Sequence, residues 1–112
     1  MRFFKDYMEM NKNELLNSGL KKFATQDYTG AITDLEKAIE LDPEFDLALN
    51  ALAESYNKLG ELDKAIEIAK RYVELSPKDP VAHTALSRLY VQKGMIEQAE
   101  KEMAISNQLA NS

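Results

Sequence analysis

The sequence repeats with a period of 34 residues, and this period constrains the fold more than any other feature. Alanine and leucine each recur three times at this interval, and four further pairs share the same offset. The matching positions are Ala31, Ala65 and Ala99; Leu41, Leu75 and Leu109; and the pairs Pro43/Pro77, Leu52/Leu86, Tyr56/Tyr90 and Gly60/Gly94. Periods of roughly 20–50 residues are typical of stacked repeat units. We therefore interpret Asp42-Pro43 as the seam between two units, not as a linker between domains.

Each unit is predicted to form two helices. After the Asp42-Pro43 seam, apolar residues follow the 3.6-residue period at Leu49, Leu52, Ala53, Tyr56 and Leu59. Gly60 should end this helix, because glycine adopts the left-handed conformation without a side-chain penalty. Asp63 is the expected N-cap of the next helix, which should end near Ser76-Pro77. No stretch alternates with period two, so no sheet is expected.

Two further helix starts can be recognised. Asn11 with Glu14 three residues later has the spacing of a capping box. Asp79 precedes Pro80, and proline is well tolerated at the first helical position. These signals and the seams predict a short N-terminal segment over 1–11 and units over 12–45, 46–79 and 80–112.

A 34-residue helix–turn–helix unit with these landmarks resembles the tetratricopeptide repeat. The matching residues are Gly19, Ala31, Ala38 and Pro43 in the first unit; Leu52, Ala53, Tyr56, Gly60, Ala65 and Pro77 in the second; and Leu86, Tyr90, Gly94 and Ala99 in the third. The resemblance implies an all-α fold, a right-handed superhelical solenoid of three repeats in a single domain. Two positions in the first unit depart from it. Lys22 stands where the other units have tyrosine, and Gln26 where they have glycine.

The last helix is expected to act as its own cap. In the first two units, the second helix presents apolar residues toward the next unit, at Ile32, Ile39, Ile66 and Val73. The corresponding residues of the third unit are Glu100 and Asn107. A polar outer face is what a terminal repeat needs in order to stay soluble.

The N-terminal residues 1–10 carry a cluster of large apolar side chains, at Phe3, Phe4, Tyr7 and Met8. So short a helix is not stable alone in water, so the segment needs a surface to lie on. Three uses are open: a cap on the first unit, an arm for self-association or partner binding, and a membrane anchor. The cap is preferred. The anchor is disfavoured, because Asp6 and Glu9 oppose binding to anionic lipid.

Composition excludes several function classes. The chain has 112 residues, a net charge of −5 and no cysteine. This acidic balance argues against nucleic acid as a partner, which requires a basic stripe. No apolar run approaches the roughly 18 residues of a membrane span, so no membrane partner is expected. The absence of cysteine leaves the redox compartment open, and a cytoplasmic location is the default expectation.

No constellation for catalysis or metal binding can be recognised. His83 is the only histidine, and it is expected to pack rather than to bind a metal, because no second ligand clusters with it. Carboxylate pairs such as Glu36 and Glu40 lie at helical spacing and are interpreted as solvated surface. Ser55 and Ser87 have no candidate base nearby. We therefore predict no enzyme activity, no cofactor and no metal.

Binding is the favoured interpretation. In stacked helical pairs the first helices line a concave surface. The predicted groove residues, those not used in packing, are Asn13, Leu16, Leu20, Phe23, Leu47, Asn50, Glu54, Asn57, Val81, Thr84, Arg88 and Val91. Asn50 and Asn57 can both donate to and accept from a peptide backbone. Glu54 and Arg88 occupy equivalent positions in neighbouring units, so they are predicted either to contact a ligand or to pair.

Some members of the family bind the acidic C-terminal tails of heat-shock chaperones through basic and amide side chains. The corresponding positions here hold Leu16, Leu20, Ala51, Val81 and Ala85. None of these can hold a carboxylate, so a chaperone tail is disfavoured as a ligand. The apolar end of the groove favours a peptide or helix with hydrophobic anchors. Alternatively, residues 1–10 of the chain itself cover Leu16, Leu20 and Phe23.

The sequence thus predicts a non-catalytic adaptor that binds a protein or peptide partner in its groove. Two alternatives stay open. One is a self-assembling scaffold, a homo-oligomer in which residues 1–10 of one copy dock onto another. The other is a regulatory subunit of an enzyme complex.

Overall fold

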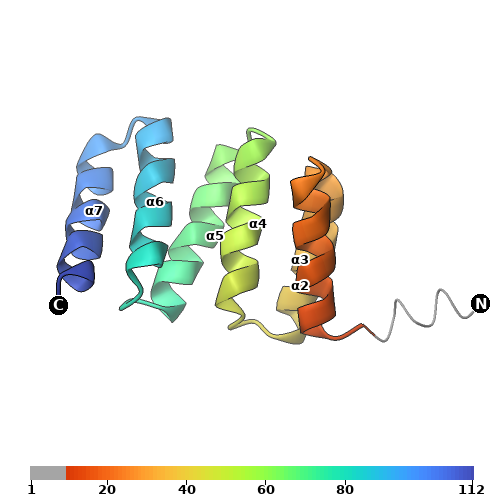
Figure 1. The fold of residues 1–112 in the computed structure, drawn as a ribbon. Coiled ribbons are helices and arrows are strands. Elements are labelled where there is room, and N and C mark those ends of the chain that lie inside the picture. The colour runs from red at the N-terminus through yellow and green to blue at the C-terminus, as the bar shows by residue number, and fades with distance from the viewer. Residues whose placement is uncertain (1–9) are drawn as a thin grey trace, which may run out of the picture.

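The computed structural model describes residues 10–112, which form three helical hairpins placed side by side (Figure 1). The helices are α2 (Lys12–Ala24), α3 (Tyr28–Leu41), α4 (Asp46–Lys58), α5 (Leu62–Leu75), α6 (Pro80–Lys93) and α7 (Ile96–Ala110). The range 10–112 contains no strand. The all-helical repeat fold predicted from the 34-residue period is therefore confirmed. The predictions for Phe3, Phe4, Tyr7 and Met8 lie outside the described residues.

The hairpins contact one another only in chain order. Hairpin α2–α3 packs on α4–α5, which packs on α6–α7 (Figure 1). In the described part of the chain, no helix of the first hairpin contacts a helix of the third. Every contact between units therefore passes through α4 and α5.

Most helix boundaries follow the predicted signals. Asn11 Oδ1 accepts a hydrogen bond from the Glu14 amide (2.9 Å), and Glu14 Oε1 accepts one from the Asn11 amide (3.3 Å), which completes the capping box. Asp79 caps α6 by accepting from the Val81 amide (2.9 Å), with proline in the first turn. Helix α5 ends at Leu75, as the Ser76-Pro77 pair predicts.

The prediction that Asp63 caps α5 is wrong. The N-cap position is held by Glu61 and helix α5 begins at Leu62, both two residues earlier than predicted. Glu61 directly follows Gly60, just as the N-cap residues Asp27 and Met95 directly follow Gln26 and Gly94 in the other two turns. Asp63 therefore lies in the first helical turn, where its carboxylate pairs with Lys93 of α6.

The three turns within the hairpins have the same backbone geometry. Gly60 and Gly94 adopt φ angles of +80° and +85°, and Gln26 adopts +67° at the equivalent position. In each turn this residue donates its amide to a carbonyl three residues earlier, at 2.9–3.0 Å. The first turn therefore holds a glutamine in the left-handed region that favours glycine.

Replacing Gln26 with glycine should raise the free energy of unfolding by about 0.5–1 kcal/mol. The left-handed conformation costs a residue with a Cβ about 1–2 kcal/mol, and the added entropy of an unfolded glycine offsets part of the gain. Urea denaturation would measure the change. Thr25→Gly is the matched control, because Thr25 has a φ of −93° and should lose stability. Equal destabilisation by both substitutions would contradict the expectation.

Small residues allow the helices of each hairpin to cross closely. Ala31 of α3 and Ala65 of α5 are completely buried, and Ala99 of α7 is nearly so. The crossing of α2 and α3 is close at Gly19, because a Cβ added there would lie 2.9 Å from Leu35 Cγ. Leu35 itself has no exposed surface. The first hairpin thus requires glycine at this position.

Lys22 has a role that the sequence alone did not suggest. Its ammonium group lies 2.9 Å from Asp34 Oδ2, and the Asp34 side chain is completely buried in α3. Ser18 Oγ donates a second hydrogen bond to the same carboxylate (2.6 Å). The equivalent positions in the second hairpin are Tyr56 and Ile68. The first hairpin therefore uses an ion pair where the second has an aromatic and an aliphatic side chain.

Tyrosine hydroxyls connect successive hairpins. The Tyr56 hydroxyl of α4 donates to Glu36 Oε1 of α3 (2.5 Å), and Glu36 is exposed, as its interpretation as solvated surface predicts. Burial and this hydrogen bond raise the pKa of Tyr56 to about 12. Tyr72 of α5 donates to Asp79 Oδ2 (2.8 Å), the residue that also caps α6. Both hydroxyls therefore act as neutral donors between elements.

Candidate functional site

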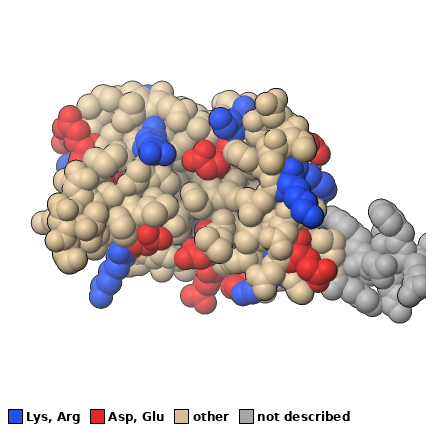
Figure 2. Space-filling view, in the orientation of Figure 1, with Lys and Arg blue, Asp and Glu red and all other residues tan. Residues whose placement is uncertain are grey.

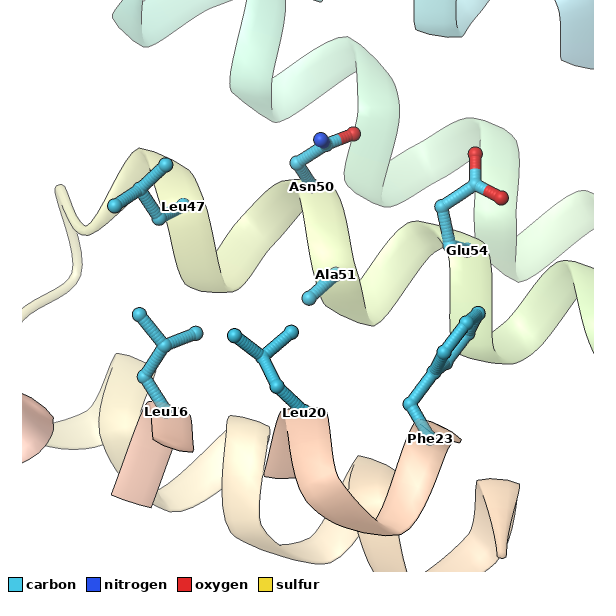
Figure 3. A pocket seen from close by; sticks show the side chains of 7 residues that line it. All are labelled: Leu16, Leu20, Phe23, Leu47, Asn50, Ala51 and Glu54. Carbon is cyan, nitrogen blue, oxygen red and sulfur yellow. The ribbon is translucent and has the colours of Figure 1, made fainter. Parts of the chain in front are cut away.

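A pocket of about 310 Å³ opens between α2 and α4, the first helices of the first two hairpins (Figure 3). Its lining residues are Leu16, Leu20 and Phe23 from α2, and Leu47, Asn50, Ala51 and Glu54 from α4. The three α2 residues follow one another at helical spacing and therefore share one face of the helix.

Figure 3 shows how the two walls meet. Leu16, Leu20 and Phe23 rise in a row from α2 toward α4, and Ala51 faces this row. Asn50 and Glu54 leave α4 on the other side and form a polar rim. The small side chain of Ala51 leaves the space that the larger α2 residues surround. The pocket is therefore apolar between the helices and polar along one edge.

The α2 residues differ in how far they are free to contact a ligand. Leu20 is 44% exposed, and Phe23 is half-buried with its ring edge-on to Tyr28 at 5.2 Å. Leu16 lines the pocket but is only 8% exposed and belongs to the core. The prediction that Leu16 is not used in packing is therefore wrong, because α2 packs on both α3 and α4. Leu20 is the accessible apolar residue of this wall.

The other predicted groove residues do not line this pocket. They are Asn13, Asn57, Val81, Thr84, Arg88 and Val91. Val81, Arg88 and Val91 are exposed on α6. The Thr84 hydroxyl forms a hydrogen bond with Ser106 Oγ of α7 (2.7 Å), so it contributes to packing within the third hairpin.

Glu54 and Arg88 do not pair. Among the described residues, neither side chain takes part in an ion pair, although Lys58 follows Glu54 by four residues on α4. The alternative in which these two charges satisfy each other is therefore wrong. Both are free to contact a ligand.

Ala51 lines the pocket but was missing from the predicted groove residues. Its small size between larger neighbours was the feature of the sequence that could have indicated the pocket.

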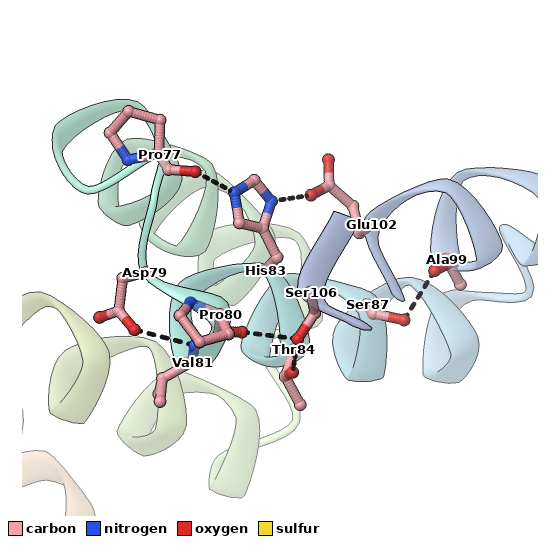
Figure 4. Close-up of polar contacts among 10 residues, drawn as sticks. All are labelled: Pro77, Asp79, Pro80, Val81, His83, Thr84, Ser87, Ala99, Glu102 and Ser106. Atoms are coloured by element: carbon pink, nitrogen blue, oxygen red, sulfur yellow. Dashed lines mark hydrogen bonds and ion pairs between the residues drawn. The ribbon is translucent and has the colours of Figure 1, made fainter. Parts of the chain in front are cut away.

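His83 connects α6 to α7 and to the loop that precedes α6 (Figure 4). It is 4% exposed. Nε2 lies 2.7 Å from the Pro77 carbonyl oxygen, and Nδ1 lies 2.6 Å from Glu102 Oε2 of α7. Both ring nitrogens are thus engaged, in agreement with the predicted structural role. In the range 10–112, no cluster of three or more histidine, cysteine or acidic residues could hold a metal ion.

The two hydrogen bonds of His83 favour the charged imidazolium, since both acceptors need an N–H donor. Burial acts to lower the pKa of His83, but the hydrogen bonds to Glu102 and Pro77 and the charges of Glu102 and Asp79 raise it above 6.5 overall. The folded protein therefore binds a proton more tightly at this site than the unfolded chain does.

Stability should consequently fall as the pH rises above about 6.5. The contribution of His83 is complete below the unfolded pKa of about 6.5 and is lost as the pH passes through the raised folded value. Urea denaturation at pH 6 and pH 8 would measure this decrease. His83→Gln should remove the pH dependence over this range. Stability that rises from pH 6 to pH 8 would contradict the assignment.

The visible surface has a mixed charge. Figure 2 shows acidic and basic side chains scattered among larger uncharged areas, with no continuous basic stripe on this face. Within residues 10–112, none of the helices combines the length and the apolar character needed to cross a membrane.

Three stacked helical hairpins with a pocket between their first helices define a helical-repeat protein. A tetratricopeptide repeat family model matches residues 22–84, more than half of the chain. The chain therefore belongs to the tetratricopeptide repeat family.

Individual relatives agree with this assignment. The small glutamine-rich tetratricopeptide repeat-containing protein 2 of Mycosarcoma maydis is 30% identical over 86 residues, which are 77% of this chain and 24% of the relative. A crystal structure of MamA superposes with a TM-score of 0.86 at 25% identity and covers 90% of this chain and 59% of that one. The Yersinia enterocolitica type III secretion translocator chaperone SycD gives 0.85 at 18% identity over 90% of this chain and 76% of that one. The chain thus spans about a quarter of its curated relative.

Proposed function

We propose that this chain is a non-catalytic adaptor that binds a peptide or helix of a partner protein through the pocket between α2 and α4. The observation that supports this most directly is an exposed apolar pocket with a polar rim, built from the first helices of two neighbouring hairpins. Concave, largely apolar sites with a few polar groups are typical of ligand-binding sites. SycD, which shares the fold, is a type III secretion translocator chaperone.

The shape of the pocket fits one or two apolar side chains. Its volume of about 310 Å³ lies at the lower end of the roughly 300–1,000 Å³ of small-ligand sites. Leu20 and Leu47 are large, exposed apolar residues at its opening. Covering them with a ligand side chain would remove apolar surface from water at about 25 cal/mol per Å². The Asn50 amide at the rim can bind the ligand backbone.

A panel of fluorescent peptides would test the proposal. Each peptide carries one phenylalanine, leucine or tryptophan anchor in an uncharged background, and a matched peptide has serine in place of the anchor. Anisotropy should show binding of anchored peptides to the wild-type chain and at least tenfold weaker binding to Leu20→Glu, which places a charge at the apolar wall.

Leu59→Glu is the matched control. Leu59 is 45% exposed, almost the same as Leu20, but it follows α4 and does not line the pocket. It should bind anchored peptides as the wild type does. Equal binding of anchored and serine peptides, or equal binding by the two leucine variants, would contradict the proposal.

A further inference from the structure

The polar rim of the pocket carries the negative charge of Glu54, next to a wall of apolar residues. Glu54 lines the pocket and is half-buried. It forms no ion pair or side-chain hydrogen bond among the described residues, although Lys58 lies one turn away on the same helix. Among the described residues, every other one that lines the pocket is apolar except Asn50, and none is a cation.

A ligand seated in the pocket would change the surroundings of this carboxylate. An apolar anchor between Leu20 and Phe23 would displace water next to Glu54. A carboxylate that loses water without gaining a partner is destabilised, and a second negative charge beside it would add repulsion. A purely apolar ligand and an acidic ligand would therefore both be penalised. A ligand with a cation beside its anchor would not.

We propose that the partner segment recognised by this chain has an apolar anchor flanked by a lysine or arginine, which pairs with Glu54 when the anchor fills the pocket. This inference rests on the proposed function and adds the charge of the ligand to it. The net charge of −5 supports the same preference, because an acidic protein attracts a cationic segment before contact.

The order of charges along the groove also favours one order of charged residues in the ligand. Arg88 occupies on α6 the position that Glu54 occupies on α4, and it is exposed without an ion pair among residues 10–112. First helices α4 and α6 are in contact. A ligand that extends from the pocket toward the third hairpin would meet the acid first and the base second. The anchor and cation of the ligand should therefore precede any acidic residue along that path.

Two probe peptides test the preference. Both carry a pair of phenylalanines as the anchor, flanked in one by two lysines and in the other by two glutamates. Fluorescence anisotropy at low ionic strength should show about fivefold tighter binding of the lysine probe to the full-length wild type, and salt should reduce the difference.

Charge reversal at the rim provides the decisive comparison. Glu54→Lys should reverse the preference, and Glu54→Gln should reduce it to the small part that the net charge supplies, while both probes still bind through their anchors. Glu74→Lys is the matched control, because Glu74 lies on α5 outside the pocket and the change in net charge is the same. This control should keep the wild-type preference within about twofold.

Different failures have different meanings. Equal binding of both probes to the wild type, or an unchanged preference in Glu54→Lys, would overturn the inference but leave the proposed function in place. If neither probe bound, nor any anchored peptide of the earlier panel, the proposed function would fail as well. If the probes bound only after Phe3→Ser and Phe4→Ser in the full chain, the occupant would be the chain's own first residues. That result would overturn the assignment of the site to a partner.

Discussion

Replacing Lys22 with methionine should lower the free energy of unfolding by about 2–3 kcal/mol. The substitution removes the Lys22 ammonium group from the completely buried carboxylate of Asp34, to which Ser18 still donates a hydrogen bond. Removing one partner of a buried pair costs about 3–5 kcal/mol, and the 39% exposure of Lys22 lets water reduce that loss. Urea denaturation at pH 7 measures the change.

The second hairpin provides the matched rescue of this variant. It has Tyr56 and Ile68 at the positions of Lys22 and Asp34. The double variant Lys22→Tyr with Asp34→Ile should therefore be as stable as the wild type or more stable, because well-packed apolar residues often replace a buried ion pair without loss. A double variant as unstable as Lys22→Met would show that the pair does more than satisfy its own charges.

Leu35→Ala should lower the free energy of unfolding by about 2–5 kcal/mol. Leu35 has no exposed surface and packs directly over Gly19, so the truncation opens a cavity at the close crossing of α2 and α3. Chemical denaturation measures the loss. A change below about 1 kcal/mol would mean that the two helices close around the missing side chain.

The effect of Gly19→Ala should change sign with the residue at position 35. In the wild type, the new Cβ would lie 2.9 Å from Leu35 Cγ, and overpacking costs about 1–3 kcal/mol. In Leu35→Ala this clash is absent, and alanine gains about 1 kcal/mol over glycine in a helix. The same substitution should then stabilise the protein. Destabilisation in both backgrounds would contradict the proposed contact.

Most of the fold could be predicted from the repeat, because helix boundaries depend on local signals. The capping box at Asn11, the Asp79-Pro80 start and the glycine turn at Gly60 all act within a few residues of the chain. Asp63 was misplaced because Glu61, directly after Gly60, takes the N-cap position without a side-chain hydrogen bond. A cap residue and a first-turn acid look alike in sequence.

The Lys22–Asp34 pair was missed for a different reason. The departure at Lys22 was visible, but its partner lies on the other helix of the hairpin, and only the crossing geometry brings the two together. A signal was nevertheless present. Lys22 and Asp34 replace Tyr56 and Ile68 in the same unit, so the two departures from the repeat occur as a pair.

The sequence predicted which residues of the first helices are exposed, but not that some of them enclose a pocket. Helical spacing placed Leu20, Leu47 and Glu54 on the exposed faces of the first helices. Whether such faces enclose a pocket depends on the sizes of the side chains that meet across the gap. The small Ala51 opposite the α2 leucines leaves space between α2 and α4. At Thr84 the hydroxyl is instead engaged with Ser106.

The lack of contact between the first and third hairpins limits communication along the chain. Energetic coupling between two sites requires an element whose state both of them change. His83 acts on the entry to α6 and on α7, whereas the pocket is built from α2 and α4. Any coupling between protonation at His83 and ligand binding in the pocket would therefore have to pass through the contacts of α4 and α5 with α6. In an exchange of parts between related chains, replacing the third hairpin should leave the pocket residues of α2 and α4 in place and change the charge that Arg88 presents to a ligand extending beyond them.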